Sequence, residues 1–373
     1  MKKKVLSATV IAVLLAAIAG VTGNAAQSKT KSTNNVLTGT GGLQVHFINV
    51  GQGDAALIDD GDFEILIDGG TRESGKKVAE YIKPYVDGNL DIIIASHEHE
   101  DHIGGLPAVF QAYQVDKIID NGRKANTKTY QNYISAIQNE KCKQIKDDNI
   151  NEIVTPSGAT LEILHLRGQY DDPNDNSVVA LLDYKDVETL FTGDLTEEAE
   201  LQNLDKFRDI DVLKAGHHGS RSSSSADLLD VIAPEYVIIS AGAKNSYGHP
   251  HAETMTSFAE FGAEVLGTFR SGDIIMTTDG TNISFDTEAR LDMKDVGAPP
   301  TKGAESTVAQ KKQPLPAKEA NKTMAYVGNR NSKIFHKATC GSVQKISKKN
   351  KVALSSKEEA LAQGYKGCGS CKP

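Results

Sequence analysis

Three histidines and an aspartate follow directly on an apolar segment of this chain. Residues 90–95 (LDIIIA) predict a buried strand, and the polar run SHEHEDH comes next. His97 and His99 alternate, so an extended backbone puts both on one face. Asp101 and His102 follow where the chain leaves the strand, and they can turn towards a second ion. Imidazole and carboxylate suit zinc, and also manganese or iron. The alternative, a polar loop that happens to be rich in histidine, leaves the further candidate ligands downstream unexplained.

Other polar residues stand at the ends of predicted strands. The early strands of the chain follow one another, whereas the later ones alternate with helices, which predicts an α/β fold of two sheets packed face to face with helices outside. Loops on one edge of a rigid sheet are a common place for metal ligands. The residues at these strand ends are Asp68, Asp194, His217, His218, His249 and His251.

Composition divides the chain into segments. Lysines, an apolar core over residues 5–21 and small residues predict a secretory signal peptide over residues 1–26, cleaved near Ala25 or Ala26. We therefore expect a secreted protein, extracellular or associated with the cell wall, with no stable membrane span after cleavage. An uncleaved N-terminal anchor is the alternative. The other predicted segments are a linker (27–42), a large body (43–290), a second linker (291–322) and a small module (323–373).

Charge is distributed unevenly between these segments. The net charge is −8, yet the small module holds ten Lys and Arg against two Glu, and residues 27–322 carry about −19. An acidic body with a basic end predicts two modules with different partners. The oligomeric state is left open.

The order of the motifs resembles the metallo-β-lactamase superfamily, and within it the hydrolase domain of ComEC competence proteins. The resemblance spans about residues 43–288 and implies an αββα sandwich with a di-metal cleft on one edge. This chain lacks the membrane-spanning channel of a competence protein, so DNA uptake as such is not implied. The resemblance rests on HxHxDH, Gly193–Asp194 and a later strand-end His, and on NVGQGDA from Asn49, NSVV from Asn176, LKAGHHGS from Leu213 and GHPH from Gly248.

The resemblance and coordination chemistry together suggest the ligands of two divalent ions, zinc or manganese. His97 and His99 are expected at the first ion and Asp101 and His102 at the second, with Asp194 bridging the two. His217 would complete the second set, and His218 is its rival. The superfamily's usual His before the bridging Asp has no clear match, because residues 174–177 (NDNS) stand there. The first ion is then under-coordinated or takes an amide or carboxylate oxygen. Residues expected to orient the ligands are Asp54, Asp68 and Asn176.

Two residues are expected to be catalytic, Asp101 and His249. Metal binding lowers the pKa of water towards ~7, so the centre could supply hydroxide at neutral pH. His249 could protonate the leaving oxygen or bind a phosphate. Plainer interpretations stay open: Asp54 as a turn residue and His251 as an exposed loop residue. His46 and His165 lie in strands and are expected to be packed or surface residues.

Three of the four cysteines lie in the small module. His336-x3-Cys340 and Cys368-x2-Cys371 offer four ligands for one structural zinc. Residues 325–373 resemble the zinc-binding module of the Ada DNA-repair protein, with His336 in place of its first Cys, and its methyl-acceptor chemistry is not implied. A disulfide between Cys368 and either Cys371 or Cys340 is the alternative.

Basic residues lie between the two halves of that predicted zinc site. They form either a patch for phosphate backbones, nucleic acid or an anionic wall polymer, or a solvated charged face. The residues of this predicted basic patch are Lys345, Lys348, Lys349 and Lys351.

Three functions are compatible with these observations. The first is a secreted metal-dependent phosphodiesterase or nuclease that acts on DNA or another polyanion. The second is a hydrolase of a small or cell-wall substrate, such as a phosphodiester, a lactone or a β-lactam, which an acidic body tolerates more easily. The third is a non-catalytic nucleic-acid-binding protein, against which the complete set of candidate ligands argues.

Overall fold

The computed structural model describes residues 42–140, 142–296, 325–346, 350–369 and 371–373. The predicted signal peptide and nearly all of the first linker lie outside the described residues. So do Lys348 and Lys349 of the predicted basic patch and most of the second linker. Among the residues that the structure describes, no helix is long and apolar enough to cross a membrane.

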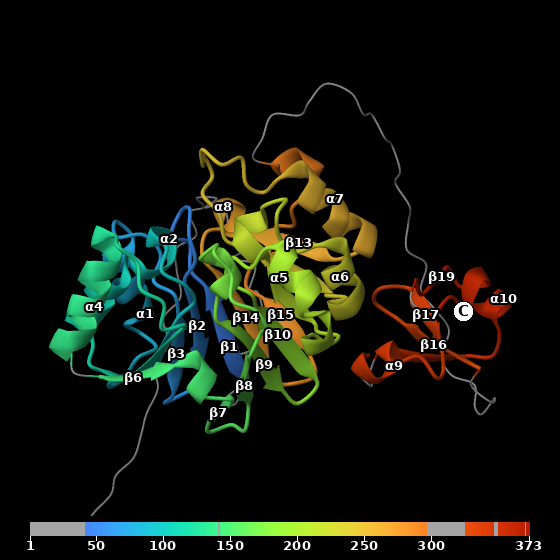
Figure 1. The fold of residues 1–373 in the computed structure, drawn as a ribbon, viewed down its shortest axis with the longest axis horizontal. Coiled ribbons are helices and arrows are strands. Elements are labelled where there is room, and N and C mark those ends of the chain that lie inside the picture. The colour runs from blue at the N-terminus through green and yellow to red at the C-terminus, as the bar shows by residue number, and fades with distance from the viewer. Residues whose placement is uncertain (1–41, 141, 297–324, 347–349, 370) are drawn as a thin grey trace, which may run out of the picture. The chain divides into compact units, whose positions relative to one another are not determined.

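Two β-sheets pack face to face in the large body (Figure 1). Apolar side chains from both sheets, such as Ile94 and Phe191, fill the space between them. The first sheet runs, in spatial order, β15 (Ile283–Phe285), β14 (Ile274–Thr278), β1 (Leu43–Phe47), β2 (Ala56–Asp59), β3 (Glu64–Ile67), β4 (Leu90–Ala95), β5 (Val115–Asp120) and β6 (Lys143–Lys146). The second runs β13 (Glu264–Gly267), β12 (Tyr236–Ile239), β11 (Val212–Lys214), β10 (Val187–Phe191), β9 (Val179–Tyr184), β8 (Thr160–Leu164) and β7 (Glu152–Val154).

Helices cover the outer face of each sheet (Figure 1). One group of helices packs its apolar residues on the first sheet, and a second group packs its apolar residues on the second sheet. The αββα sandwich expected from the sequence is therefore confirmed. The first group is α1 (Gly75–Ile82), α2 (Glu100–Ile103), α3 (Leu106–Ala112) and α4 (Lys128–Glu140). The second is α5 (Glu197–Gln202), α6 (Ala226–Ile232), α7 (Ala252–Phe261) and α8 (Thr268–Ser271). Short 3-10 turns are Asp147–Asn149, Asn174–Asn176, Leu204–Lys206, Gly216–Gly219 and Met293–Asp295.

Parallel pairing brings the polar strand ends together. β3, β4, β5 and β6 pair in parallel in the first sheet, as do β10, β11, β12 and β13 in the second. The carboxyl ends of parallel strands lie at one edge of a sheet. Asp68 follows β3, Ser96 follows β4, and Lys214 ends β11 beside Phe191 of β10. The candidate ligands therefore meet at this edge of the sandwich.

The packed body continues slightly past its predicted end. Leu291, assigned by sequence to the second linker, is only 8% exposed and packs with the helices on the second sheet. A 3-10 turn with a capping box follows at Met293–Asp295.

A small four-stranded sheet forms the C-terminal module. Its core holds few large side chains, among them Phe335, Leu354 and Tyr365. Ser356 caps the last helix, because its Oγ accepts a hydrogen bond from the Glu359 backbone N–H at 3.0 Å. So small a core gives a domain little stability by itself. The elements are β18 (Lys351–Leu354), β16 (Tyr326–Asn329), β17 (Ile334–Lys337) and β19 (Lys366–Gly367), with α9 (Ser342–Lys345) and α10 (Lys357–Ala362).

Candidate metal centre

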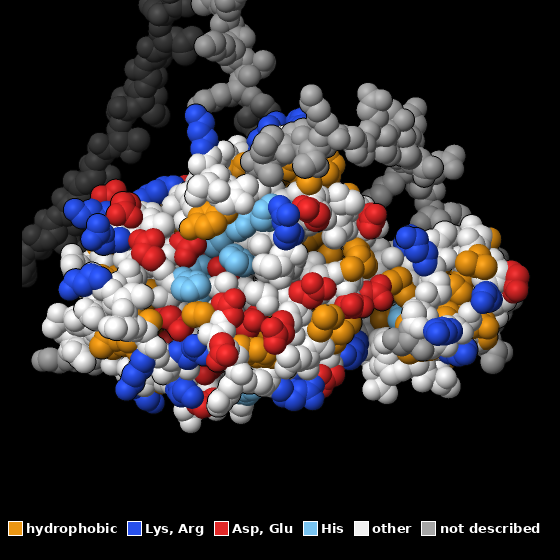
Figure 2. All heavy atoms as spheres, turned by 45° about the horizontal axis from the view of Figure 1, so that its top comes forward, with side chains coloured by type: hydrophobic (Ala, Val, Ile, Leu, Met, Phe, Trp, Pro, Cys, Tyr) orange, Lys and Arg blue, Asp and Glu red, His pale blue; other side chains and the backbone are white. Residues whose placement is uncertain are grey.

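A pocket of about 270 Å³ opens where the two sheets present their carboxyl edges. In the space-filling view, histidine side chains form a continuous strip on this face, with acidic side chains around it (Figure 2). The pocket is lined by Gln52, His99, Glu100, Asp101, Asn174, Asp194, His217, His218, Tyr247 and His249.

The first candidate ion set consists of His97, His99 and Asp194. One ligand atom from each lies within 4.8 Å of the others. His97 Nε2 lies 3.1 Å from His99 Nδ1 and 3.8 Å from Asp194 Oδ2. Burial first, and then the neighbouring His102, hold the pKa of His97 well below its usual range, so its ring is neutral, as a metal ligand must be.

The second candidate ion set shares Asp194 with the first. It joins Asp54, His102, Asp194 and His218, again with ligand atoms within 4.8 Å of one another. His102 Nε2 lies 3.3 Å from Asp194 Oδ1, and His218 Nε2 lies 3.5 Å from Asp194 Oδ2. Asp101 Oδ2 is 3.2 Å from His218 Nε2, so the Asp101 carboxylate adjoins this set.

Unpartnered polar atoms show that the two sets suit metal ions. Within the described part of the chain, His102 Nε2, His218 Nε2 and Asp194 Oδ1 are buried and make no hydrogen bond, and the polar atoms nearest to them belong to the other candidate ligands. Leaving such atoms unsatisfied costs about 1–3 kcal/mol each, and a cation held between them would remove that cost. The donors are imidazole and carboxylate, which are ligands of both zinc and manganese.

Asp68 orients one ligand through a chain of hydrogen bonds. It adopts φ 59 directly after β3 and accepts from Ser96 N–H at 2.8 Å and Ser96 Oγ–H at 2.7 Å. Asp68 Oδ2 also lies 2.8 Å from His102 Nδ1. A proton held on Nδ1 by this carboxylate leaves Nε2 as the ligand atom. Asp68 therefore fixes both the tautomer and the direction of His102.

Asp54 plays the same part for His218, and it has a buried cation of its own. Asp54 Oδ1 lies 3.1 Å from His218 Nδ1, while Oδ2 is 2.7 Å from Lys214 Nζ. Burial raises the pKa of Asp54, but Lys214 and His218 outweigh it and lower that pKa to about 2. Sequence reasoning gave no role to Lys214, although this residue lies at the end of a strand and within the motif LKAGHHGS, three residues before His217.

The two adjacent histidines occupy an unusual backbone. His217 and His218 have φ values of 48 and 57, the left-handed region that residues with a Cβ avoid. Both side chains reach towards Asp194, but their surroundings differ. His218 is buried and its Nδ1 lies between Asp54 and the Ser240 carbonyl oxygen, at 3.1 Å from each. His217 Nε2 lies 3.7 Å from Asp194 Oδ2 and belongs to neither ion set.

In the loop at residues 174–177, which stands in the sequence where the family usually has a histidine, Asn174 rather than Asn176 lines the pocket. Asn176 turns back on its own loop, since its Nδ2 donates to the carbonyl oxygens of Tyr170 and Asp172. Asn174 instead lines the pocket, is 8% exposed, and has a buried Oδ1 with no hydrogen-bond partner among the described residues. Its amide oxygen is therefore a buried acceptor without a hydrogen-bond partner in the wall of the pocket.

The rim of the pocket is built from the loop after β12. Gln52 Oε1 accepts from Gly242 N–H at 3.2 Å, so its amide nitrogen faces His249 Nδ1 at 3.3 Å. His249 Nδ1 must then accept, which puts the ring proton on Nε2. Burial first, and then the nearby His218 and His217, lower the pKa of His249 to about 3, so the ring is neutral. His251 Nδ1 is occupied as the acceptor of the Arg221 backbone N–H.

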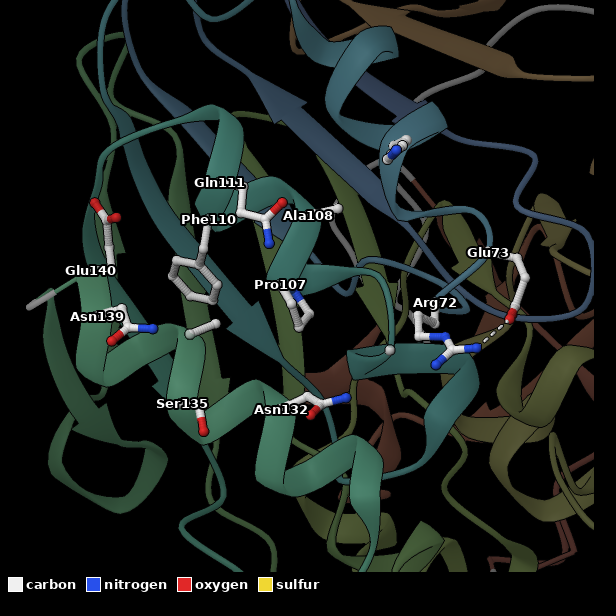
Figure 3. Close-up of a pocket in the computed structure, with 13 residues that line it drawn as sticks. Arg72, Glu73, Pro107, Ala108, Phe110, Gln111, Asn132, Ser135, Asn139 and Glu140 are labelled. Atoms are coloured by element: carbon white, nitrogen blue, oxygen red, sulfur yellow. Dashed lines mark hydrogen bonds and ion pairs between the residues drawn. The ribbon is translucent and has the colours of Figure 1, made fainter.

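The remaining histidines of the body lie outside the pocket. His46 is buried, with Nδ1 3.0 Å from the Tyr81 hydroxyl, and His165 is half-buried directly after β8, with Nε2 3.0 Å from Asn151 Oδ1. A larger cavity, of about 770 Å³, lies elsewhere. It is lined by residues of α1, α3 and α4, such as Gln111 and Asn132, and no histidine faces it (Figure 3).

The C-terminal module brings its four candidate ligands together. One atom each from His336, Cys340, Cys368 and Cys371 lies within 4.8 Å of the others, and the three cysteines are unbonded thiols. His336 Nδ1 is buried without a hydrogen-bond partner in the described residues. A Cys3His set of this kind fits tetrahedral zinc. In the predicted basic patch, Lys351 is exposed and Lys345 is half-buried.

Comparison with known proteins agrees with this geometry. Residues 48–243 match the metallo-beta-lactamase superfamily, so the chain belongs to that superfamily. Its curated relatives include competence proteins, as the resemblance to ComEC predicted, and the chain is a hydrolase of this superfamily related to them.

Three relatives define that relationship. Recombination protein 2 of Haemophilus influenzae is 31% identical over 235 residues, covering 62% of this chain and 28% of that protein. ComE operon protein 3 of Bacillus subtilis is 28% identical over 263 residues (62% and 32%), and Competence protein ComA of Neisseria gonorrhoeae is 30% identical over 228 residues (60% and 30%). The chain thus spans about a third or less of these relatives.

Proposed function

We propose that this protein is a secreted, metal-dependent phosphodiesterase that cleaves nucleic acid or a related anionic polymer. The observation that carries the proposal is the pair of ion sets that share the Asp194 carboxylate. The Asp194 carboxylate lies near ligands of both sets and could hold two cations side by side, as two-metal phosphoryl hydrolysis requires. We assign His97, His99 and Asn174 to the first ion and His102, His218 and Asp101 to the second.

The chain's own residues would position the substrate in this cleft. When bound, the two ions would activate a water molecule and stabilise the charge that develops on phosphoryl oxygens. His249 carries its proton on Nε2 and can donate a hydrogen bond to a phosphate or leaving-group oxygen. Because the His249 pKa is about 3, this ring acts as a neutral donor rather than as an imidazolium acid.

Two observations favour a phosphodiester over a β-lactam. An amide oxygen, that of Asn174, stands where the superfamily usually has a histidine, and oxygen-rich sets suit manganese. The relatives are named as recombination and competence proteins, which points to nucleic acid. The acidic body opposes binding of polyanions at low salt, so we further propose that the basic C-terminal module, stabilised by zinc at its Cys3His set, holds the polymer.

The small volume of the pocket is also compatible with a second function, hydrolysis of a small substrate. At about 270 Å³ it would also accept a small or cell-wall substrate, such as a phosphodiester, a lactone or a β-lactam.

The mature chain, residues 27–373, should be loaded with Mn²⁺ or Zn²⁺ and tested on plasmid DNA, RNA, bis-p-nitrophenyl phosphate and nitrocefin. We expect DNA or RNA and the small diester to be cleaved, and Asp101→Ala to lose at least 100-fold in kcat. Cleavage of nitrocefin alone would overturn the proposal, and full activity of Asp101→Ala would overturn the site assignment.

A further inference from the structure

An exposed tyrosine stands at the mouth of the candidate metal centre. Tyr247 is 64% exposed and lines the same pocket as Asp194 and His249. Of the large apolar side chains that are exposed in the described residues, Tyr247 alone is aromatic. The others are Val154, Leu201, Met293 and Leu361. None of those four lines the pocket.

The tyrosine ring is held in a fixed place by its loop. Asn245 Oδ1 accepts from the backbone N–H groups of Tyr247 (3.1 Å) and His249 (2.9 Å). Asn245 Nδ2 donates to the carbonyl oxygens of Gly242 (2.8 Å) and His249 (2.7 Å). The Tyr247 ring lies nearly parallel to the His249 ring, with centroids 5.6 Å apart and planes 24° apart. One face of the tyrosine is thus supported, and the exposure of the side chain leaves room for a ligand on the other.

The pocket is too small to enclose a large substrate. Ligand sites that enclose drug-sized molecules have volumes of about 300–1,000 Å³, and this pocket measures about 270 Å³. A phosphodiester group can enter, while the groups on either side of it must rest on the rim. Tyr247 is the part of the rim that offers a flat apolar face.

We propose that Tyr247 is a stacking platform for the nucleobase next to the scissile phosphate, so that the substrate is a nucleic acid strand with an unstacked base at this point. The inference rests on the proposed phosphodiesterase function. Stacking on an aromatic side chain requires a base but no particular base, because every base has a π face. The platform therefore selects strands that carry bases over polyol phosphates of the wall, and single strands over duplexes.

The experiment compares two strands that differ only in their bases. Residues 27–373 with Mn²⁺ are assayed for cleavage of a single-stranded oligothymidylate and of the same strand built from abasic residues. Binding of both strands is measured separately by fluorescence anisotropy with the metal omitted. Tyr247→Ala should raise KM and Kd for the thymidylate strand about ten-fold and leave both nearly unchanged for the abasic strand. Tyr247→Phe should resemble the wild type. The matched control is Leu201→Ala, which removes another exposed apolar side chain, away from the pocket.

The outcomes separate this inference from the function on which it rests. Equal KM values for the two strands in the wild type would overturn the platform and leave phosphodiester cleavage standing. An equal loss on both strands in Tyr247→Ala would also overturn it, because it would show that the ring only supports His249. Failure of the wild type to cleave either strand or bis-p-nitrophenyl phosphate would instead reject the proposed function.

Discussion

Lys214 shows how one residue can shape the metal centre from outside it. Its side chain is almost fully buried, and its ammonium group contacts Asp54, which in turn holds His218. A buried charge is stable only when it is paired, so this ion pair fixes the Asp54 carboxylate in the position that orients His218.

Replacing Lys214 by Met should therefore weaken metal binding. We expect Mn²⁺ affinity to fall about 10–100-fold, because Asp54, which orients His218, loses the cation that fixes its carboxylate. The free energy of unfolding should fall by about 3 kcal/mol, because Asp54 is left as an unpaired buried charge. Isothermal titration calorimetry and urea denaturation measure the two effects. Lys128→Met, at an exposed helix position, is the control. Wild-type affinity in Lys214→Met would contradict the assigned role.

Pairs of neighbouring residues show most clearly what the sequence could and could not predict. The alternation of His97 and His99 was enough to predict that their side chains lie together in one candidate ion set, because the segment after β4 stays extended as far as His99. Sequence could not separate His217 from His218, since the answer depends on two left-handed φ values. Nor could it prefer Asn174 to Asn176, because the choice follows from hydrogen bonds within the loop.

At the scale of elements, glycines let the segment that carries His102, from β4 to α3, pack against the end of β3. Gly105 joins α2 to α3, and its N–H donates to the Gly70 carbonyl oxygen at 2.9 Å. Gly69 N–H likewise donates to the His102 carbonyl oxygen at 2.8 Å. A Cβ on Gly105 would meet the Gly69 carbonyl oxygen and the Gly75 backbone.

Gly105→Ala should accordingly destabilise the fold and displace His102. We expect a loss of about 3 kcal/mol in the free energy of unfolding, because the obstacle is backbone and cannot rotate away. Thermal and urea denaturation report the loss. In Gly88→Ala the new Cβ has open space, so that variant should stay within about 0.5 kcal/mol of the wild type. Similar unfolding free energies for the two variants would show that Gly105 does not pack closely against the Gly69 carbonyl oxygen.

The C-terminal element can be tested without interference from the other site, because only its ligands include thiols. Co²⁺-loaded protein should show a thiolate-to-cobalt charge-transfer band, and Cys368→Ser should weaken it by about a third or more, since one of the three sulfur ligands is gone. Absorption spectroscopy gives the measurement. Cys142→Ser, which changes the cysteine outside the set, should keep the band. A wild-type protein with a Cys340–Cys368 or Cys368–Cys371 disulfide and no band would contradict the zinc assignment.

For the whole molecule, the sequence order of strands and helices was enough to predict the sandwich, since parallel pairing and layer packing follow general rules. The uneven charge was also plain from composition. Interactions between segments distant in sequence were not predictable. Glu64, for example, is only 1% exposed at the start of β3, a position that looks like an ordinary polar strand end in the sequence.

Glu64 should make stability depend on pH. Burial first, and then Asp91 and Asp59, raise its pKa to about 8. The folded chain then holds a proton that the unfolded chain has lost, so the free energy of unfolding falls as pH rises from about 4.5 to about 8. Glu64→Gln should be near neutral at pH 4 and more stable than wild type at pH 9 by on the order of 2 kcal/mol. Urea denaturation across this pH range measures the difference in unfolding free energy between Glu64→Gln and the wild type. Glu73→Gln, at an exposed position, is the control. The same difference at pH 4 and pH 9 for Glu64→Gln would show that Glu64 is not buried in this way.

The most direct test of the whole account is anomalous diffraction from crystals of residues 27–373 soaked in Mn²⁺, recorded at the manganese absorption edge. The account predicts two peaks about 3.5–4 Å apart, one on each side of the Asp194 carboxylate. The first should lie by His97 and His99, and the second by His102 and His218. Two peaks elsewhere, or none at Asp194 when the protein hydrolyses bis-p-nitrophenyl phosphate, would contradict it.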